Sequence, residues 1–337
     1  MKRIIARLLV ETLLVIAATG IVPWAARAEE AGSGHYLPGT TADFIDMLPD
    51  RDSLTLVYAN AFTYYHGSLS ANRELEFGGL LTANAKATIY ADTSLFLLQT
   101  PWKLFGGQYG GAIVVPYFWL EVNGNVALNT RLPTFGPKVR DTSNGFSDIQ
   151  LIPLMFGWKY GDLKWETRFS IYAPTGGFET GQLANVGKNY WTFEPALAVS
   201  FVSSKIGLEL TGFAGLDFNT ENGATDYQTG DQFHLDITAA QHLPLFGGFG
   251  GIGANGFYYQ QFTGDSGSGA RLGSFEGMTT GVGPVISYAY RLGKFDLATE
   301  AKWLPEIDVT HRLSGDIVWF KIGLSYAQQP ENPVSGM

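Results

Sequence analysis

The sequence predicts an all-β protein, a transmembrane antiparallel up-and-down β-barrel of about 12 strands with a short N-terminal plug-like segment. Three observations predict this fold class. Apolar residues alternate with period two over long segments, short and long connections alternate along the chain, and the composition is that of strands and turns. Charged residues make up only 16 % of the 337 residues, against about 25 % in a typical soluble domain.

The composition also excludes several classes of protein. Hydrophobic residues reach 45 %, which excludes a disordered chain, and the net charge of −9 argues against binding to nucleic acid. The chain contains no cysteine, so disulfides, thiolate metal sites and cysteine nucleophiles are excluded.

Residues 1–28 are predicted to form a cleaved signal peptide. Basic residues open the chain, an apolar core runs from Leu8 to Val22, and Ala26 to Ala28 form an A-x-A cleavage site. A membrane anchor is the alternative interpretation of this segment. Cleavage would leave a mature chain with a net charge near −12, since four positive charges and one negative charge are removed. We expect export to the bacterial outer membrane.

The alternation predicts which face of each strand meets lipid. In the seven clearest segments, one face has no charged residue at any of 41 positions, whereas the intervening positions carry twelve. The uncharged face consists of alternate positions in the ranges 81–91, 165–173, 191–201, 206–218, 233–243, 280–290 and 295–303. We expect this face, including Val199, Leu208 and Leu297, to contact lipid. A secreted soluble β protein is the alternative, but these segments exceed the usual length of about 5–6 residues.

The connections give an independent count of the strands. Five short turns alternate with six longer polar connections, at 66–78, 131–147, 177–188, 220–231, 263–276 and 307–315. Eleven connections join twelve strands, and both termini then lie on the periplasmic side. An open sheet edge is not tolerated in lipid, so the first strand, 53–65, should pair with the last, 316–327. The barrel is predicted to span 53–328, between an N-terminal segment at 29–52 and a tail at 329–337.

The charged face of the strands should line the lumen. The predicted pore-lining or substrate-contacting residues are Tyr117, Trp119, Glu121, Lys164, Glu166, Arg168, Glu194, Glu209, His234, Asp236 and Lys302. Lys164, Glu166 and Arg168 either brace the barrel or form a constriction that selects solutes. His234, Asp236 and His242 share one face, but His242 lies about 26 Å from His234 along an extended strand. We therefore expect no metal site and no cofactor.

The segment before the first strand is richer in apolar residues than a free tail requires. His35, Tyr36, Phe44 and Met47 are predicted to belong to a plug in the periplasmic mouth, packed against Tyr117 and Trp119. Residues 41–48 have a helix-like rhythm that ends at Pro49. A disordered leader or a docking strip for a periplasmic partner is the alternative.

Two short motifs are weaker signals. Residues 264–267 (GDSG) match the string around a trypsin-like nucleophile, but they lie in a Gly/Ser-rich connection, and we expect a loop. Residues 247–253 (GGFGGIG) are followed by no predicted helix and no lysine at the right position, so we expect a turn and a strand.

Residues 32–44 (GSGHYLPGTTADF), continuing to Met47-Leu48-Pro49, resemble the opening of the outer-membrane family labelled for the meta pathway of phenol degradation, which includes sphingosine-induced members. Residues 94–102 (SLFLLQTPW) are similar as well. The resemblance implies passive uptake of hydrophobic or aromatic small molecules, such as phenolic compounds or long-chain lipids, by a protein that is not an enzyme.

The expected partners are outer-membrane lipid and lipopolysaccharide, a small hydrophobic solute and the barrel-assembly machinery. We expect no binding to nucleic acid. An outer-membrane lipid-modifying enzyme and a structural or adhesive barrel are the alternative functions.

Overall fold

The computed structural model describes residues 33–42, 46–49, 51–69, 73–128, 135–274 and 276–328. The predicted signal peptide at 1–28, Phe44 of the predicted plug and the tail at 329–337 lie outside these ranges. The described residues include no helix long and apolar enough to cross a membrane, a finding that does not bear on β-barrels.

Fourteen strands in the described ranges form one antiparallel sheet. Their bounds are β1 Thr55–Ser68, β2 Glu74–Phe77, β3 Leu80–Leu104, β4 Gly107–Ala127, β5 Phe135–Phe146, β6 Ile149–Tyr160, β7 Leu163–Ala173, β8 Thr192–Val202, β9 Leu208–Asn219, β10 Gln232–Leu245, β11 Gly248–Gln261, β12 Met278–Leu292, β13 Phe295–Thr310 and β14 Ser314–Ala327.

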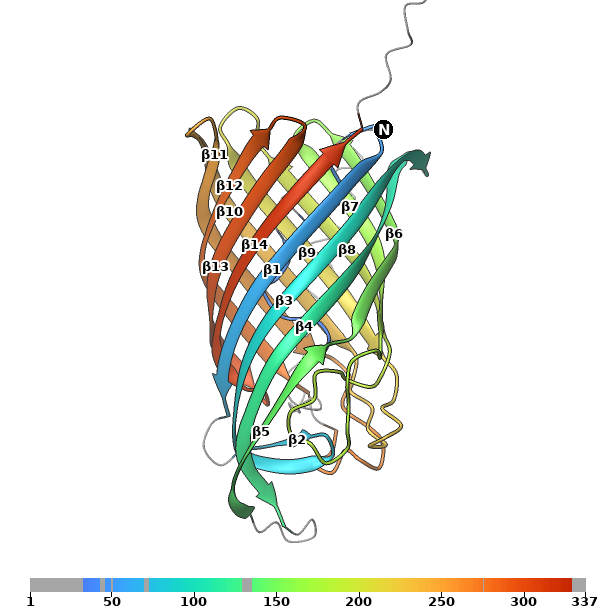
Figure 1. Ribbon diagram of the computed structural model, residues 1–337, viewed down its shortest axis with the longest axis vertical. Helices are drawn as coiled ribbons and strands as arrows, with labels where there is room; N and C mark the ends of the chain where they lie inside the picture. The colour runs from blue at the N-terminus through green and yellow to red at the C-terminus, as the bar shows by residue number, and fades with distance from the viewer. Residues whose placement is uncertain are drawn as a thin grey trace, which may run out of the picture.

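Twelve of these strands close into a barrel, as the sequence predicts. β1 pairs with β14 over its whole length, from Thr55 opposite Ala327 to Ser68 opposite Ser314. On its other edge β1 pairs with β3, then β3 with β4 and β4 with β6, after which the strands follow in chain order (Figure 1). Closure leaves these twelve strands with partners on both edges, which satisfies their backbone groups in lipid.

β2 and β5 are additions that the sequence analysis does not predict. β5 falls in the range 131–147, which is expected to be a loop. It pairs with the half of β4 from Tyr117 to Ala127, whereas β6 pairs with the other half, from Gln108 to Val114. β4 has 21 residues, more than the 9–11 residues that cross a bilayer, so its distal half needs a partner of its own.

The two ends of the barrel differ in their connections. The five tight turns lie at one end, and the other six connections lie at the opposite end together with β2 and β5 (Figure 1). The long connection expected at 307–315 is wrong, because β13 runs to Thr310 and β14 begins at Ser314, which leaves three residues between them. Phe105-Gly106 and Phe246-Gly247 each have two residues at positive φ, between 46° and 80°, which suits two-residue type I′ hairpins. Short turns mark the periplasmic end of outer-membrane barrels, so the long connections form the outer end.

The predicted orientation is confirmed on β8, β9 and β10. Leu197, Leu210 and Ile237 are 39–51 % exposed on the outer face, whereas their neighbours Glu194, Glu209 and Asp236 are at most 2 % exposed inside the barrel. Val199, Leu208 and Leu297 lie on the same outward rows.

The predicted orientation is wrong on β3. Of the odd positions from 81 to 91, all expected to face lipid, those from 87 to 91 face the lumen, where Ala87, Ile89 and Ala91 line a cavity. Tyr90 and Phe96 point outward with 44 % and 51 % of their surface exposed. The charge contrast of this stretch gives the wrong face, because its two charged residues, Lys86 and Asp92, lie on the outward row. There Asp92 accepts a hydrogen bond from Asn60 at 2.6 Å.

The prediction for β4 is also wrong, since its one charged residue, Glu121, lies on the outward row. Tyr117, Trp119 and Glu121 were expected to face inward, but the even positions, among them Phe118 and Leu120, line the cavity. Trp119 is 45 % exposed on the outer face, and Glu121 forms an ion pair with Arg140 at 2.7 Å.

Candidate lumenal site

The N-terminal segment lies inside the barrel. We call its described parts, residues 33–42 and 46–49, the lumenal segment. It packs against the polar wall formed by β7 to β10, β13 and β14, and not against Tyr117 and Trp119 as predicted. The helix expected over 41–48 is absent from the described residues of that range, and Ala42 has a φ of 66°, which no right-handed helix accommodates.

Asp236 on β10 is the first anchor of the lumenal segment. Its Oδ2 accepts hydrogen bonds from the Thr41 N–H at 2.9 Å and the Thr41 hydroxyl at 2.6 Å. Its Oδ1 accepts hydrogen bonds from the Tyr36 hydroxyl and from the Gly39 N–H. The carboxylate is fully buried, so these four donors replace the water that it lacks.

Glu166 and Arg168 on β7 form the second anchor. They pair with each other at 2.5 Å inside the barrel. Glu166 Oε2 accepts a hydrogen bond from the Leu48 N–H at 2.7 Å, and Arg168 donates to the Asp46 carbonyl at 2.7 Å. The pair therefore holds the lumenal segment in place and does not form an open constriction of charged side chains.

Two lysines complete the attachment of the lumenal segment. Lys302 donates to the Thr41 carbonyl at 3.1 Å, and Lys321 on β14 is ion-paired with Asp46. Met47 is 7 % exposed and packs against Ala196, Ala198 and Phe213.

His35 and Asp148 form the third anchor, near the outer end. Asp148 lies in the short connection between β5 and β6 and contacts His35 Nε2 at 3.0 Å. It also accepts hydrogen bonds from the N–H groups of Gly176 and Lys188. Burial by itself would raise the pKa of Asp148, but His35 and these two donors outweigh it and hold the pKa below its usual value.

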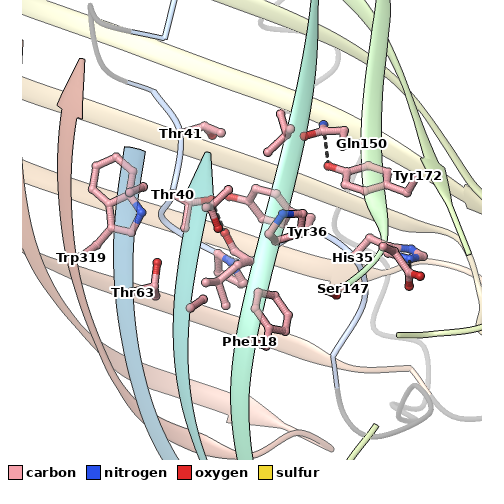
Figure 2. Close-up of a pocket in the computed structure, with 18 of the residues that line it drawn as sticks. His35, Tyr36, Thr40, Thr41, Thr63, Phe118, Ser147, Gln150, Tyr172 and Trp319 are labelled. Carbon is pink, nitrogen blue, oxygen red and sulfur yellow. Dashed lines mark hydrogen bonds and ion pairs between the residues drawn. The ribbon is translucent and has the colours of Figure 1, made fainter. Parts of the chain in front are cut away.

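An apolar cavity of about 510 Å³ lies between the lumenal segment and the opposite wall of the barrel. Inward residues of β1, β3 and β4 line that wall, among them Ala59, Ala61, Ile89, Ala91, Leu95 and Phe118. Figure 2 shows Tyr36, Thr40 and Thr41 of the segment between Trp319, Thr63 and Phe118 on one side and Tyr172 on the other. On β1 the lining runs from Val57 to Tyr65, about 26 Å along the strand.

Apolar clusters lie at both ends of this cavity. At the outer end, Leu75 and Phe77 of β2 pack with Leu183 of the connection between β7 and β8 and with Tyr65 of the barrel. At the periplasmic end, Leu48 of the lumenal segment packs with Leu97, Ile152 and Met155. A solute that moves along the cavity therefore meets apolar side chains at either end.

The remaining predicted residues have different surroundings. Glu194 and Arg168 line the cavity, and Lys164 lies with Glu166 in a smaller pocket near the periplasmic hairpins. His234 is fully buried beneath Tyr36, with ring centroids 3.7 Å apart. Glu209 accepts hydrogen bonds from Thr211 and contacts His242 at 2.6 Å.

Asp217 lies on the charged face that the alternation assigns to the lumen, but it is not among the predicted site residues. Asp148 and Lys321 were not predicted. Lys321 lies on the lumenal row of β14, so the alternation could have found it. Asp148 directly follows the stretch 131–147 that was expected to be a connection, and no local signal places it inside the barrel.

The GDSG motif has a structural role. Asp265 accepts hydrogen bonds from the Tyr227 hydroxyl at 2.5 Å and the Gly230 N–H at 3.0 Å, and the Ser266 backbone forms a bridge with Gln228. These bonds join two outer loops, as expected of a loop motif.

The chain is similar to known proteins in sequence and in fold. The sequence model of the family described as "Putative MetA-pathway of phenol degradation" matches residues 68–322. No curated protein matches the sequence. The COG4313 outer membrane channel from Pseudomonas putida F1 shares the fold with a TM-score of 0.55 and 12 % identity, over 85 % of this chain and 98 % of that chain.

The β domain of the Bordetella autotransporter BrkA aligns with a TM-score of 0.45 and 14 % identity, over 82 % of this chain and 100 % of that chain. The likeness to the first structure shows the fold of an outer-membrane β-barrel.

Proposed function

The chain belongs to the family described as putative MetA-pathway of phenol degradation, and on this premise we propose that it is an outer-membrane channel for the passive uptake of hydrophobic or aromatic small molecules. Phenolic compounds are the solutes that the family description favours.

The apolar cavity is the observation that supports this proposal most. A solute that buries about 100 Å² of apolar surface in it gains about 2.5 kcal/mol over water. An ion or a sugar would lose hydrogen bonds with water that the alanine, leucine and isoleucine side chains of β1 and β3 do not replace. The apolar wall therefore favours apolar solutes over polar ones, and the solute moves down its own concentration gradient.

The lumenal segment divides the barrel into two unequal parts. On one side the segment fills the space next to the polar wall, where it contacts Asp236, Glu166 and Lys302. On the other side the cavity lies between the segment and the apolar wall. We propose that displacement of this segment, or of the outer apolar cluster around Phe77, controls passage. A water-filled porin would instead have a polar interior.

We likewise propose that the chain is not an enzyme. The one nucleophile-like motif is engaged in loop contacts, with Asp265 held by Tyr227 and Gly230 rather than by a histidine. The buried histidines His35 and His234 contact aromatic rings, carboxylates and Thr192.

The test fills the cavity without touching its anchors. Ala61→Trp places a large side chain in the cavity, whereas Phe62→Trp changes the adjacent residue, which is 43 % exposed on the outer face. Uptake of radiolabelled phenol into a strain that lacks other phenol channels should fall for Ala61→Trp and not for Phe62→Trp. Folding of both variants is checked by heat-modifiable migration. Equal uptake by the two folded variants would contradict the proposal.

A further inference from the structure

Three potential metal ligands meet on the polar wall of the barrel, beneath the lumenal segment. Glu194 of β8, Asp217 of β9 and His234 of β10 come from three neighbouring strands, and each is at most 2 % exposed. One donor atom from each lies within 4.8 Å of the other two. We propose that these residues bind a divalent first-row transition-metal ion, of which Zn²⁺ is the representative.

The unsatisfied charge of Asp217 is the first argument. Within the described residues, neither of its carboxylate oxygens has a hydrogen-bond donor, although the side chain is fully buried. Its ionic neighbour is His234 Nε2, 3.8 Å from Oδ1. Buried charges in proteins are paired or coordinate metals, and two carboxylates beside one imidazole carry more negative charge than a single proton balances.

The space left by Gly215 is the second argument. Gly215 lies opposite His234 in the register of β9 and β10. A Cβ on this glycine would lie 2.3 Å from His234 Nε2 and 2.9 Å from Glu194 Oε1. The absence of a side chain on Gly215 therefore keeps free the space between the imidazole nitrogen and a carboxylate oxygen.

The distances between the donor atoms suit such an ion. His234 Nε2 lies 3.3 Å from Glu194 Oε1 and 3.8 Å from Asp217 Oδ1. Ligands about 2.0–2.2 Å from a tetrahedral ion are about 3.3–3.6 Å apart, so small side-chain rotations bring all three atoms into range. One imidazole and two carboxylates form a mixed nitrogen and oxygen set, which suits Zn²⁺ and its neighbours better than Ca²⁺ or Mg²⁺.

The surrounding residues hold the ligands in place. Glu194 Oε2 accepts hydrogen bonds from the Tyr172 hydroxyl at 3.1 Å and from Gln150 at 3.4 Å, which leaves Oε1 turned toward His234. The imidazole is stacked between Tyr36 at 3.7 Å and Phe213 at 5.8 Å. Outer contacts of this kind orient metal ligands.

Tyr36 connects the site to the lumenal segment. Its ring covers His234, and its hydroxyl donates a hydrogen bond to Asp236. A metal ion that binds only while Tyr36 covers the site stabilises the docked segment by mass action.

The experiment measures metal binding, not transport, so its failure and that of the proposed channel function are distinguishable. The full-length mature protein is refolded in detergent, stripped with EDTA and dialysed against Zn²⁺, and bound zinc is counted by mass spectrometry. We expect one equivalent per chain, a higher unfolding temperature with Zn²⁺, and affinity at least about tenfold weaker in His234→Gln and Asp217→Asn. His242→Gln is the matched control, since His242 also contacts a lumenal carboxylate, 2.6 Å away, but lies outside the cluster.

A second measurement needs no variant. Loading wild-type protein with Co²⁺ should give the strong visible absorption of a tetrahedral site. The absence of bound zinc in folded wild-type protein, or unchanged affinity in a folded His234→Gln variant, would overturn the proposal. The first of these outcomes would mean that His234 holds only a proton between the two carboxylates.

Discussion

Replacing Asp236 by asparagine should release the lumenal segment while leaving the barrel intact. The carboxylate accepts four hydrogen bonds from the segment, two on each oxygen. Asparagine turns one oxygen into an NH₂ donor that faces two other donors, so at least two of the four bonds are lost. Hydrogen bonds to a charged group contribute about 1.5–3 kcal/mol each, which gives roughly 3–6 kcal/mol in total. The population of the undocked segment should therefore rise by about 10²–10⁴-fold, at about 1.4 kcal/mol per factor of ten.

Labelling of a single cysteine measures this change, because the natural chain has none. Met47→Cys places the thiol at a position that is 7 % exposed in the docked segment. A water-soluble maleimide should label it slowly in the parent and much faster with Asp236→Asn. Single-channel conductance should rise toward that of a variant that lacks residues 32–49, which defines the fully open limit.

Asp141→Asn is the matched control for the labelling assay. Asp141 on β5 also accepts two backbone hydrogen bonds, but from Leu183 and Ala184 of an outer loop and not from the lumenal segment. It should leave labelling of the cysteine unchanged. If Asp236→Asn labels as slowly as the parent while the barrel is folded, Asp236 is not the anchor and the reasoning from its hydrogen bonds is refuted.

Three further predictions follow from the same structure. Leu208→Arg puts a charge on the lipid-facing row and should cost about 2–4 kcal/mol in barrel stability, which is measured as reduced assembly. Glu209→Gln should assemble normally, and equal assembly of the two variants would contradict the orientation. Because the folded pKa of Asp148 is lowered, its stabilising contribution is present above its unfolded pKa of about 3.9 and is lost as pH falls through the lower folded value. Acidification below about pH 4 should therefore raise single-channel conductance, and Asp148→Asn should reduce that pH dependence; an unchanged dependence in folded Asp148→Asn would contradict the role of Asp148 as an anchor. Gly39→Ala should also speed labelling, because Gly39 has a φ of 80° and a Cβ there would lie 2.3 Å from Leu304; unchanged labelling would show that the segment adapts.

The sequence by itself determined the fold class, the number of barrel strands and the pairing of the first strand with the last. It did so because lipid imposes a rule on every strand that crosses it: one face is apolar, and every backbone group is paired. Where the other face carries charge, as with Glu194, Glu209 and Asp236, the rule also gives the orientation of the side chains.

Where the charged residue of a strand lies on its outward row, as Asp92 of β3 and Glu121 of β4 do, the rule gives the wrong orientation. Tyr117 and Trp119 could have faced either side on local grounds, and only the register of β4 with β3 and β6 decided that they point outward. The sequence therefore did not predict the apolar lumenal wall of the candidate channel, since alanine and isoleucine fit a lipid-facing row equally well.

The tertiary structure alone decided how the lumen is filled. Asp236 meets Thr41 across 195 positions of the chain, and His35 meets Asp148 across 113. Such contacts form because buried carboxylates require hydrogen-bond donors, which the N-terminal segment supplies. The alternation along a strand carries no information about where that segment binds. The meeting of Glu194, Asp217 and His234 likewise depends on the register of three neighbouring strands, which brings together residues that the sequence separates.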